Sequence, residues 1–179
     1  MLRWGMTAWL FLACATPRGR ASAAEELALA LTPASCRCAL SLDQRLTVSE
    51  GTNTHGVDAR LEVDGASVDV ALVSSGQVVG ALHWDGKRLE ARSPLAWPPV
   101  VTPARVLSDV QLVWWPEAAV REGLPAGWVL EEEPLARRLR RDGLDVVSVR
   151  YEGSAPAWRR VVLEHRGRYT IEIESVESR

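Results

Sequence analysis

Most of the chain alternates apolar and polar residues with a period of two, and this pattern constrains the fold more than any other feature of the sequence. It starts near Asp43 and is clear in SVDVALVSS in the first half and in YTIEIES near the end. Because successive side chains of a β-strand point to opposite faces, a period of two is typical of strands with one buried face. Asp64-Gly65 and Asp85-Gly86 are turn dipeptides that join such strands into hairpins. The sequence therefore predicts an antiparallel sheet with one apolar face.

The alternation stops after residue 92, where a loop and two helices are expected. The loop, SPLAWPPVVTP, is rich in proline and has an apolar tip of Leu95 and Trp97. Thr102 followed by Pro103 is a favourable helix start, and Pro116 ends or kinks this helix and begins a second one. Apolar residues recur three and four positions apart, as on one face of an amphipathic helix. The residues predicted to line a hydrophobic hollow or its lid are Val106, Leu107, Val110, Val113, Trp114 and Trp115.

About five strands, two helices and about five more strands predict a single α+β domain. A sheet of about ten short strands twists and curls strongly, so we expect one strongly curved antiparallel sheet, with one or two helices covering its concave face. Two adjacent tryptophans suit the covering helix, because each buried aromatic side chain removes about 150–250 Å² from water. Trp114 and Trp115 then either complete a packed core or leave an apolar cavity beneath a lid.

The first residues, MLRWGMTAWLFLAC, have the positive charge and short apolar stretch of a signal peptide, and two cleavage sites stay open. FLAC resembles a lipobox, which predicts removal of residues 1–13 and a lipid attached to Cys14. ASA, at residues 21–23, instead predicts removal of residues 1–23 and a soluble periplasmic or secreted protein. No apolar run reaches the roughly 18 residues that span a bilayer.

The remaining chain is expected to consist of a tether or short helix at residues 24–40 and a single domain at residues 41–179. The only cysteines are Cys14, Cys36 and Cys38, so the mature chain keeps the sequence CRC. In an oxidising compartment these two cysteines close a small disulfide ring or stay as two thiols.

Composition and motifs argue against two functional classes. A formal net charge of −2 offers no basic surface for nucleic acid. Ser74 or Ser75, His83 and Asp85 are close enough in sequence to suggest a hydrolase triad, but no nucleophile elbow of the G-x-S-x-G type is present. The three histidines show no metal-ligand spacing, so neither a metal nor another cofactor is predicted. We therefore expect no catalytic residue.

Two charged runs are interpreted as solvated parts of strands. EEE, at residues 131–133, is not expected to form an acid–base pair, because adjacent strand residues point to opposite faces. RRLRR, at residues 137–141, is expected to be an exposed strand with Leu139 inward. The alternative, a patch for anionic lipid headgroups, is weaker because the arginines do not share one face.

Five segments between residues 40 and 177 resemble an uncharacterised family of bacterial outer-membrane lipoproteins, a domain of unknown function related to LolB. They are ARLEVDG, SSGQVVGALHWDGKRLEARSP, LSDVQLVWWPEAAVREGLPAGWVLEEE, DVVSVRYEG and VVLEHRGRYTIEIESVE. The sharpest motif is D-x-Q-L-V-x-W-P, from Asp109 to Pro116. SSGQVVGALHWDG also resembles the strand pair after a Pro-Leu-Gly turn in LolB proteins, with Ser74-Ser75 in place of Pro-Leu.

The resemblance implies a LolA/LolB-like open β-barrel without catalytic activity, and genes for aryl-polyene-type lipid synthesis often lie beside such family members. It implies binding of a lipid, acyl chain or acylated protein in the hollow and delivery to the inner leaflet of the outer membrane, by a monomer. Ala15 after Cys14, rather than Asp, favours an outer-membrane lipoprotein facing the periplasm. The alternative function is a structural accessory lipoprotein with a filled core that supports an envelope or lipid-biosynthesis complex. A cavity of several hundred Å³ favours the carrier.

Overall fold

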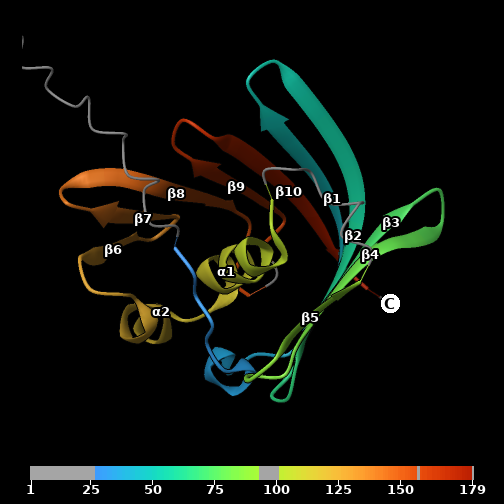
Figure 1. Cartoon of the computed structure of the whole chain (residues 1–179), viewed down its shortest axis with the longest axis horizontal. Helices are drawn as coiled ribbons and strands as arrows, with labels where there is room; N and C mark the ends of the chain where they lie inside the picture. Colours follow the sequence, from blue (N-terminus) through green and yellow to red (C-terminus); the bar gives the residue numbers. More distant parts are fainter. Residues whose placement is uncertain (1–26, 93–100, 157, 179) are drawn as a thin grey trace, which may run out of the picture.

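The computed structural model describes residues 27–92, 101–156 and 158–178. Within them, ten strands form a single antiparallel sheet that curves around helix α1 (Figure 1). The strands are β1 (Leu40–Glu50), β2 (Asn53–Val63), β3 (Val68–Ser74), β4 (Gln77–Trp84), β5 (Leu89–Arg92), β6 (Trp128–Glu133), β7 (Ala136–Arg141), β8 (Leu144–Glu152), β9 (Arg160–His165) and β10 (Tyr169–Glu177). The predicted α+β fold, a strongly curved antiparallel sheet covered by helices, is confirmed.

Nine of the ten strands bury alternate side chains along at least part of their length, as the alternation in the sequence requires, and the short edge strand β5 buries none. In β10 the buried positions are Tyr169, Ile171, Ile173 and Ser175, and the residues between them face away from the core. The hairpins turn where they were predicted. At the β4–β5 turn the Asp85 carboxylate accepts hydrogen bonds from the backbone N–H groups of the two residues after the turn glycine.

The order of strands in the sheet explains why helices cover its concave face. Consecutive strands are neighbours from β5 back to β1 and from β10 back to β6, and β1 pairs with β10 to join the two halves. The edge strands are therefore β5 and β6, which follow one another in sequence. The connection between them has to cross from one edge to the other, and it contains α1 (Pro103–Trp114) and α2 (Glu117–Gly123).

The limits of α1 follow from its sequence. Thr102 caps the first turn, with its Oγ1 accepting a hydrogen bond from the Arg105 backbone N–H at 3.3 Å, and Pro103 occupies the first turn. Helical geometry ends at Trp114, and Pro116, which has no N–H to donate, precedes α2. An ion pair between Glu117 and Arg121 links one turn of α2.

Residues 27–38 differ from the tether expected for this part of the chain. Leu27 and Leu29 are buried in the core, and a short 3-10 helix, η1 (Pro33–Cys36), follows them. A disulfide joins Cys36 to Cys38, so the disulfide ring is the alternative that is observed. This segment therefore belongs to the folded domain.

No helix in the described part of the chain is long and apolar enough to cross a membrane.

Candidate functional site

The concave face of the sheet contains an apolar cavity of about 70 Å³ between α1 and strands β1, β2, β3, β9 and β10. Val106, Val110 and Trp114 line it from one face of α1, at positions four residues apart. The opposite wall contains Leu46, Val48, Val57, Ile171 and Ile173 on the sheet.

The exposure of the lining residues shows where the cavity opens. Leu46 and Val57, which are opposite one another on β1 and β2, are partly exposed, and so are Val106 and Val110 on α1. The neighbouring lining residues on β1 and β2, which are Gln44, Val48 and Ala59, are buried. The opening therefore lies between α1 and the β1–β2 hairpin.

The structure divides the six predicted lid residues into two groups. Val106, Val110 and Trp114 line the cavity. Leu107, Val113 and Trp115 are buried and lie outside its lining. Leu95 and Trp97, predicted as an apolar loop tip, and Cys14, the predicted lipid attachment site, lie outside the described residues. Val101, the first described residue after this loop, lines the cavity.

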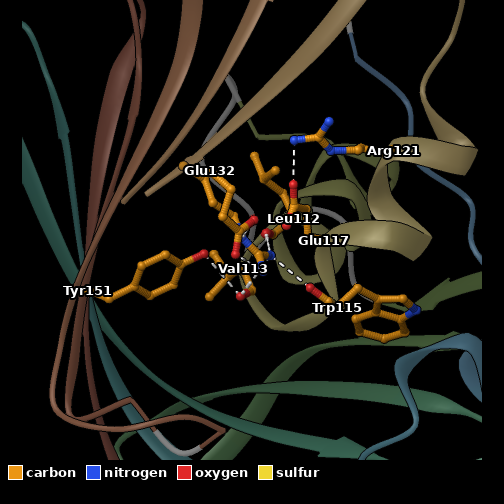
Figure 2. Close-up of polar contacts among 8 residues, drawn as sticks. Leu112, Val113, Trp115, Glu117, Arg121, Glu132 and Tyr151 are labelled. Carbon is orange, nitrogen blue, oxygen red and sulfur yellow. Dashed lines mark hydrogen bonds and ion pairs between the residues drawn. The ribbon is translucent and has the colours of Figure 1, made fainter. Parts of the chain in front are cut away.

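The C-terminal end of α1 is fixed by a buried arginine on β7, Arg137. Figure 2 shows its partners at this end of the helix, which are Leu112, Trp115 and Glu132. Arg137 Nη1 donates hydrogen bonds to the carbonyl oxygens of Leu112 at 2.6 Å and Trp115 at 2.8 Å. Its Nε also lies 2.9 Å from a Glu132 carboxylate oxygen. A cation at the C-terminus of a helix is stabilised by the unpaired carbonyls and by the helix dipole.

Tyr151 on β8 adds a further hydrogen bond to this end of the helix. Its hydroxyl donates to the Val113 carbonyl at 3.2 Å, and the Arg137 guanidinium lies 5.8 Å from the centre of its ring (Figure 2). Burial is the main reason why the pKa of Tyr151 is raised above the ordinary tyrosine range. The phenol therefore stays protonated and remains a donor.

The prediction of a solvated RRLRR strand is wrong for Arg137, whose exposed fraction is 8%. Residues two apart in a strand face the same side, so Arg137 points inward together with Leu139, while Arg138 is exposed. The sequence shows that Arg137 and Leu139 lie two residues apart and therefore share a face. The burial of Arg137 could not be inferred in this way, because it depends on the carbonyl groups at the end of α1, which only the fold brings opposite β7.

The segment before η1 fixes the same half of α1 from the other side. The Gln111 side chain donates to the Leu31 carbonyl at 2.8 Å and accepts from the Leu31 N–H at 2.9 Å. The Trp115 indole N–H donates to Ser35 Oγ at 2.9 Å, and the Leu29 N–H donates to Ser108 Oγ at 3.1 Å. These contacts attach α1 to the N-terminal segment of the described domain.

The middle of α1 is attached to the sheet through one buried carboxylate. Asp109 lies 2.8 Å from His165 Nε2 on β9 and accepts a hydrogen bond from the Tyr169 hydroxyl on β10 at 3.1 Å. The Arg105 guanidinium lies 5.5 Å from the centre of the Tyr169 ring. Burial, followed by the negative charge of Asp109, raises the pKa of Tyr169 above its ordinary range. Asp109 also lines the cavity.

The residues considered for a hydrolase triad do not come together as one. His83 Nδ1 lies 2.7 Å from Asp69 across β3 and β4, on an exposed face, and this hydrogen bond raises the pKa of the imidazole. Asp85 accepts backbone hydrogen bonds at its own turn. Among the described residues, no group of three or more His, Cys, Asp and Glu side chains has a metal-binding arrangement.

Comparisons with other proteins assign the chain to a family. The family model described as "Protein of unknown function (DUF3261)" matches residues 41–177, which confirms the predicted resemblance to a domain of unknown function. Comparison with curated proteins gives no match. Among solved structures, the chain is similar to a LolA superfamily protein from Nitrosomonas europaea, with 8% identity and a TM-score of 0.49, over 85% of this chain and 92% of that one.

Proposed function

The chain belongs to the DUF3261 family of proteins of unknown function, and from this premise we propose that it is a non-catalytic cell-envelope protein that binds an acyl chain between α1 and the sheet. The acyl chain belongs to a lipid or to an acylated protein. The observation that carries the proposal is the apolar cavity in the concave face, which opens between α1 and the β1–β2 hairpin. Transfer of methylene groups from water into such an environment stabilises a complex by about 0.8 kcal/mol per group.

The size of the cavity sets a condition on binding. Its volume of about 70 Å³ is well below the roughly 300–1,000 Å³ of ordinary ligand pockets. A long acyl chain therefore requires the N-terminal half of α1 to move away from β1 and β2. Such a movement keeps the hydrogen bonds of Arg137, Tyr151 and Gln111, which lie toward the other end of the helix. It breaks the hydrogen bond between the Leu29 N–H and Ser108 and the contact of Arg105 with the Tyr169 ring.

The small volume also favours a second candidate function, a structural accessory protein whose hollow is filled by its own side chains. In that case α1 is a permanent part of the core, and the molecule acts through its outer surface. The two functions differ in one measurable property, which is the uptake of an acyl chain by the purified protein.

A fluorescent fatty acid, cis-parinaric acid, tests the proposal. We expect saturable binding by the full chain and at least a tenfold weaker affinity after Val57→Trp, which places an indole at the opening of the cavity. Val129→Trp is the matched control, because Val129 is an exposed valine on edge strand β6 and lies outside the cavity lining. Absence of binding by the unchanged protein, or equal binding by both variants, contradicts the acyl-chain proposal and favours the accessory function.

We assign the membrane anchor to a lipid on Cys14, which leaves the folded domain on the periplasmic side of the outer membrane. Membrane fractionation of Cys14→Ala tests this assignment. The variant should leave the membrane fraction and should keep its first 13 residues. A variant that stays with membranes and begins at Ala24 shows that the ASA site is used instead.

The loop tip of Leu95 and Trp97 is proposed to contact the inner leaflet of the outer membrane or a donor's acyl chain. The support is its apolar sequence and its position just before Val101, which lines the cavity. A Leu95→Glu, Trp97→Glu double variant should keep its melting temperature and lose liposome binding. A large fall in melting temperature, or unchanged liposome binding, removes the loop from the mechanism.

A further inference from the structure

The wall of the apolar cavity is interrupted by a buried amide side chain. Gln44 on β1 lines the cavity and has an exposed fraction of 8%. Its inward neighbours on β1 and β2 are apolar, with Leu46 two residues along the strand and Ala59 directly opposite on β2. A primary amide in the wall does not stabilise bound hydrocarbon, and burying an amide without hydrogen-bond partners is unfavourable.

The amide is only partly satisfied by the protein. Its Nε2 donates one hydrogen bond, at 3.2 Å, to the hydroxyl of Ser175, which lies opposite Gln44 on β10. Among the described residues, Ser175 is the only hydrogen-bond partner of this side chain. A primary amide carries two N–H groups and a carbonyl oxygen with two lone pairs. One N–H donor and the carbonyl acceptor therefore remain for another molecule.

A second polar group belongs to the opposite wall. Trp114 on α1 also lines the cavity, and its indole Nε1 is fully buried without a hydrogen-bond partner in the described part of the chain. The neighbouring Trp115 differs, because its indole N–H donates to Ser35. Buried polar groups in proteins are nearly always paired. The Trp114 N–H is enclosed within the wall, so the Gln44 amide is the polar group that can contact a ligand atom in the cavity.

We infer that the acyl chain bound in this cavity carries a hydroxyl group, which hydrogen-bonds to the Gln44 amide. This inference rests on the proposed acyl-chain binding and names the class of chain. A hydroxyl both accepts a hydrogen bond from an amide N–H and donates one to the amide carbonyl, whereas an ester or ketone oxygen only accepts. Gln44 lies two residues from Leu46 at the opening, about 7 Å along β1, so the hydroxyl enters the hollow with the chain.

Oleate and ricinoleate test the inference, because they differ by one hydroxyl group in the middle of the chain. Displacement of bound cis-parinaric acid from the full chain gives both affinities. We expect ricinoleate to bind about tenfold more tightly, the factor that corresponds to one additional net hydrogen bond. In Gln44→Met, which keeps the side-chain length and removes the hydrogen bonds, the two affinities should become equal through a loss for ricinoleate alone. In a second variant, Ser175→Ala, which removes only the hydroxyl that accepts the hydrogen bond from Gln44, we expect a reduced preference for ricinoleate.

Leu46→Met is the matched control, since it alters the same wall without changing its polarity and should preserve the preference for ricinoleate. Equal affinities of oleate and ricinoleate for the unchanged protein overturn the inference and leave acyl-chain binding intact. A preference that persists in Gln44→Met also overturns it, because the hydroxyl then binds elsewhere. Failure to bind either fatty acid overturns both the inference and the proposed function.

Discussion

The two ends of helix α1 are attached to the sheet in different ways. At the C-terminal end, Arg137, Tyr151 and Gln111 satisfy the backbone groups of the helix and of the segment beside it. The apolar cavity follows one face of the helix from Val106 to Trp114, and nearer the N-terminal end Ser108 and Asp109 supply the polar links. The difference shows how one helix can be part of the core at one end and a cover at the other.

Physical chemistry explains why this division is useful. Buried hydrogen bonds are directional and costly to leave unpaired, so they fix one arrangement of the helix. Apolar contacts with Val106 and Val110 have no direction, and a ligand's methylene groups replace them at little cost. The proposed function therefore requires the helix to move at the apolar end and to stay in place at the polar end.

The largest expected effect comes from removing the arginine at the polar end. Arg137→Met should lower the free energy of unfolding by about 3–5 kcal/mol, because it leaves Glu132 and the carbonyls of Leu112 and Trp115 without their buried partner. Arg138→Met is the control, since this exposed side chain pairs with Glu133 on the surface and should cost less than about 1 kcal/mol. Urea denaturation measures both. Similar losses in the two variants would mean that the end of α1 is not fixed by Arg137.

Much of the fold follows from the sequence, because it depends on local patterns. The period-two segments become strands, Asp85-Gly86 becomes a hairpin turn, and the helix begins after Thr102 and ends before Pro116. These features depend on residues that are close in sequence. They are therefore accessible without knowledge of which strands lie side by side.

The polar contacts of the hollow were not predictable in the same way. Asp109 is 56 residues from His165, and Gln111 is 80 residues from Leu31, so no local pattern connects the partners. The motif D-x-Q-L-V-x-W-P marked this part of the chain without revealing its contacts. The alternation places Gln44 at an inward position of its strand. Its hydrogen-bond partner, Ser175, is brought opposite it only by the pairing of β1 with β10.

A smaller effect is expected from the buried carboxylate under the middle of α1. Asp109→Leu should lower the free energy of unfolding by about 1–3 kcal/mol, because His165 and the Tyr169 hydroxyl lose a buried partner while the new side chain adds apolar contact with the cavity. Hydrogen exchange should accelerate for amides in the first turns of α1 and stay unchanged near Trp114. Acceleration along the whole helix would contradict the division into a fixed end and a movable end.

Alkaline pH should weaken the attachment of α1 at its middle, through Tyr169, and at its C-terminal end, through Tyr151. The pKa values of Tyr151 and Tyr169 are raised in the folded protein, chiefly by burial, so the folded state holds both phenol protons more tightly than the unfolded state does. Stability is unaffected below about pH 10, the ordinary tyrosine pKa, and then falls by about 1.4 kcal/mol per pH unit for each tyrosine. Absorbance of tyrosinate should appear only as the protein unfolds. Ionisation of either phenol in the folded protein at pH 10 would contradict this.

The smallest effect provides the sharpest comparison, because it concerns two adjacent tryptophans. Trp115 donates its indole N–H to Ser35, whereas the indole N–H of Trp114 beside the cavity has no partner among the described residues. Trp115→Phe should therefore cost about 1–2 kcal/mol from the lost hydrogen bond and the space left behind, and Trp114→Phe should cost less than about 1 kcal/mol. Parallel urea denaturation of the two variants measures the difference. A larger loss for Trp114→Phe would show that this N–H is already paired within the protein.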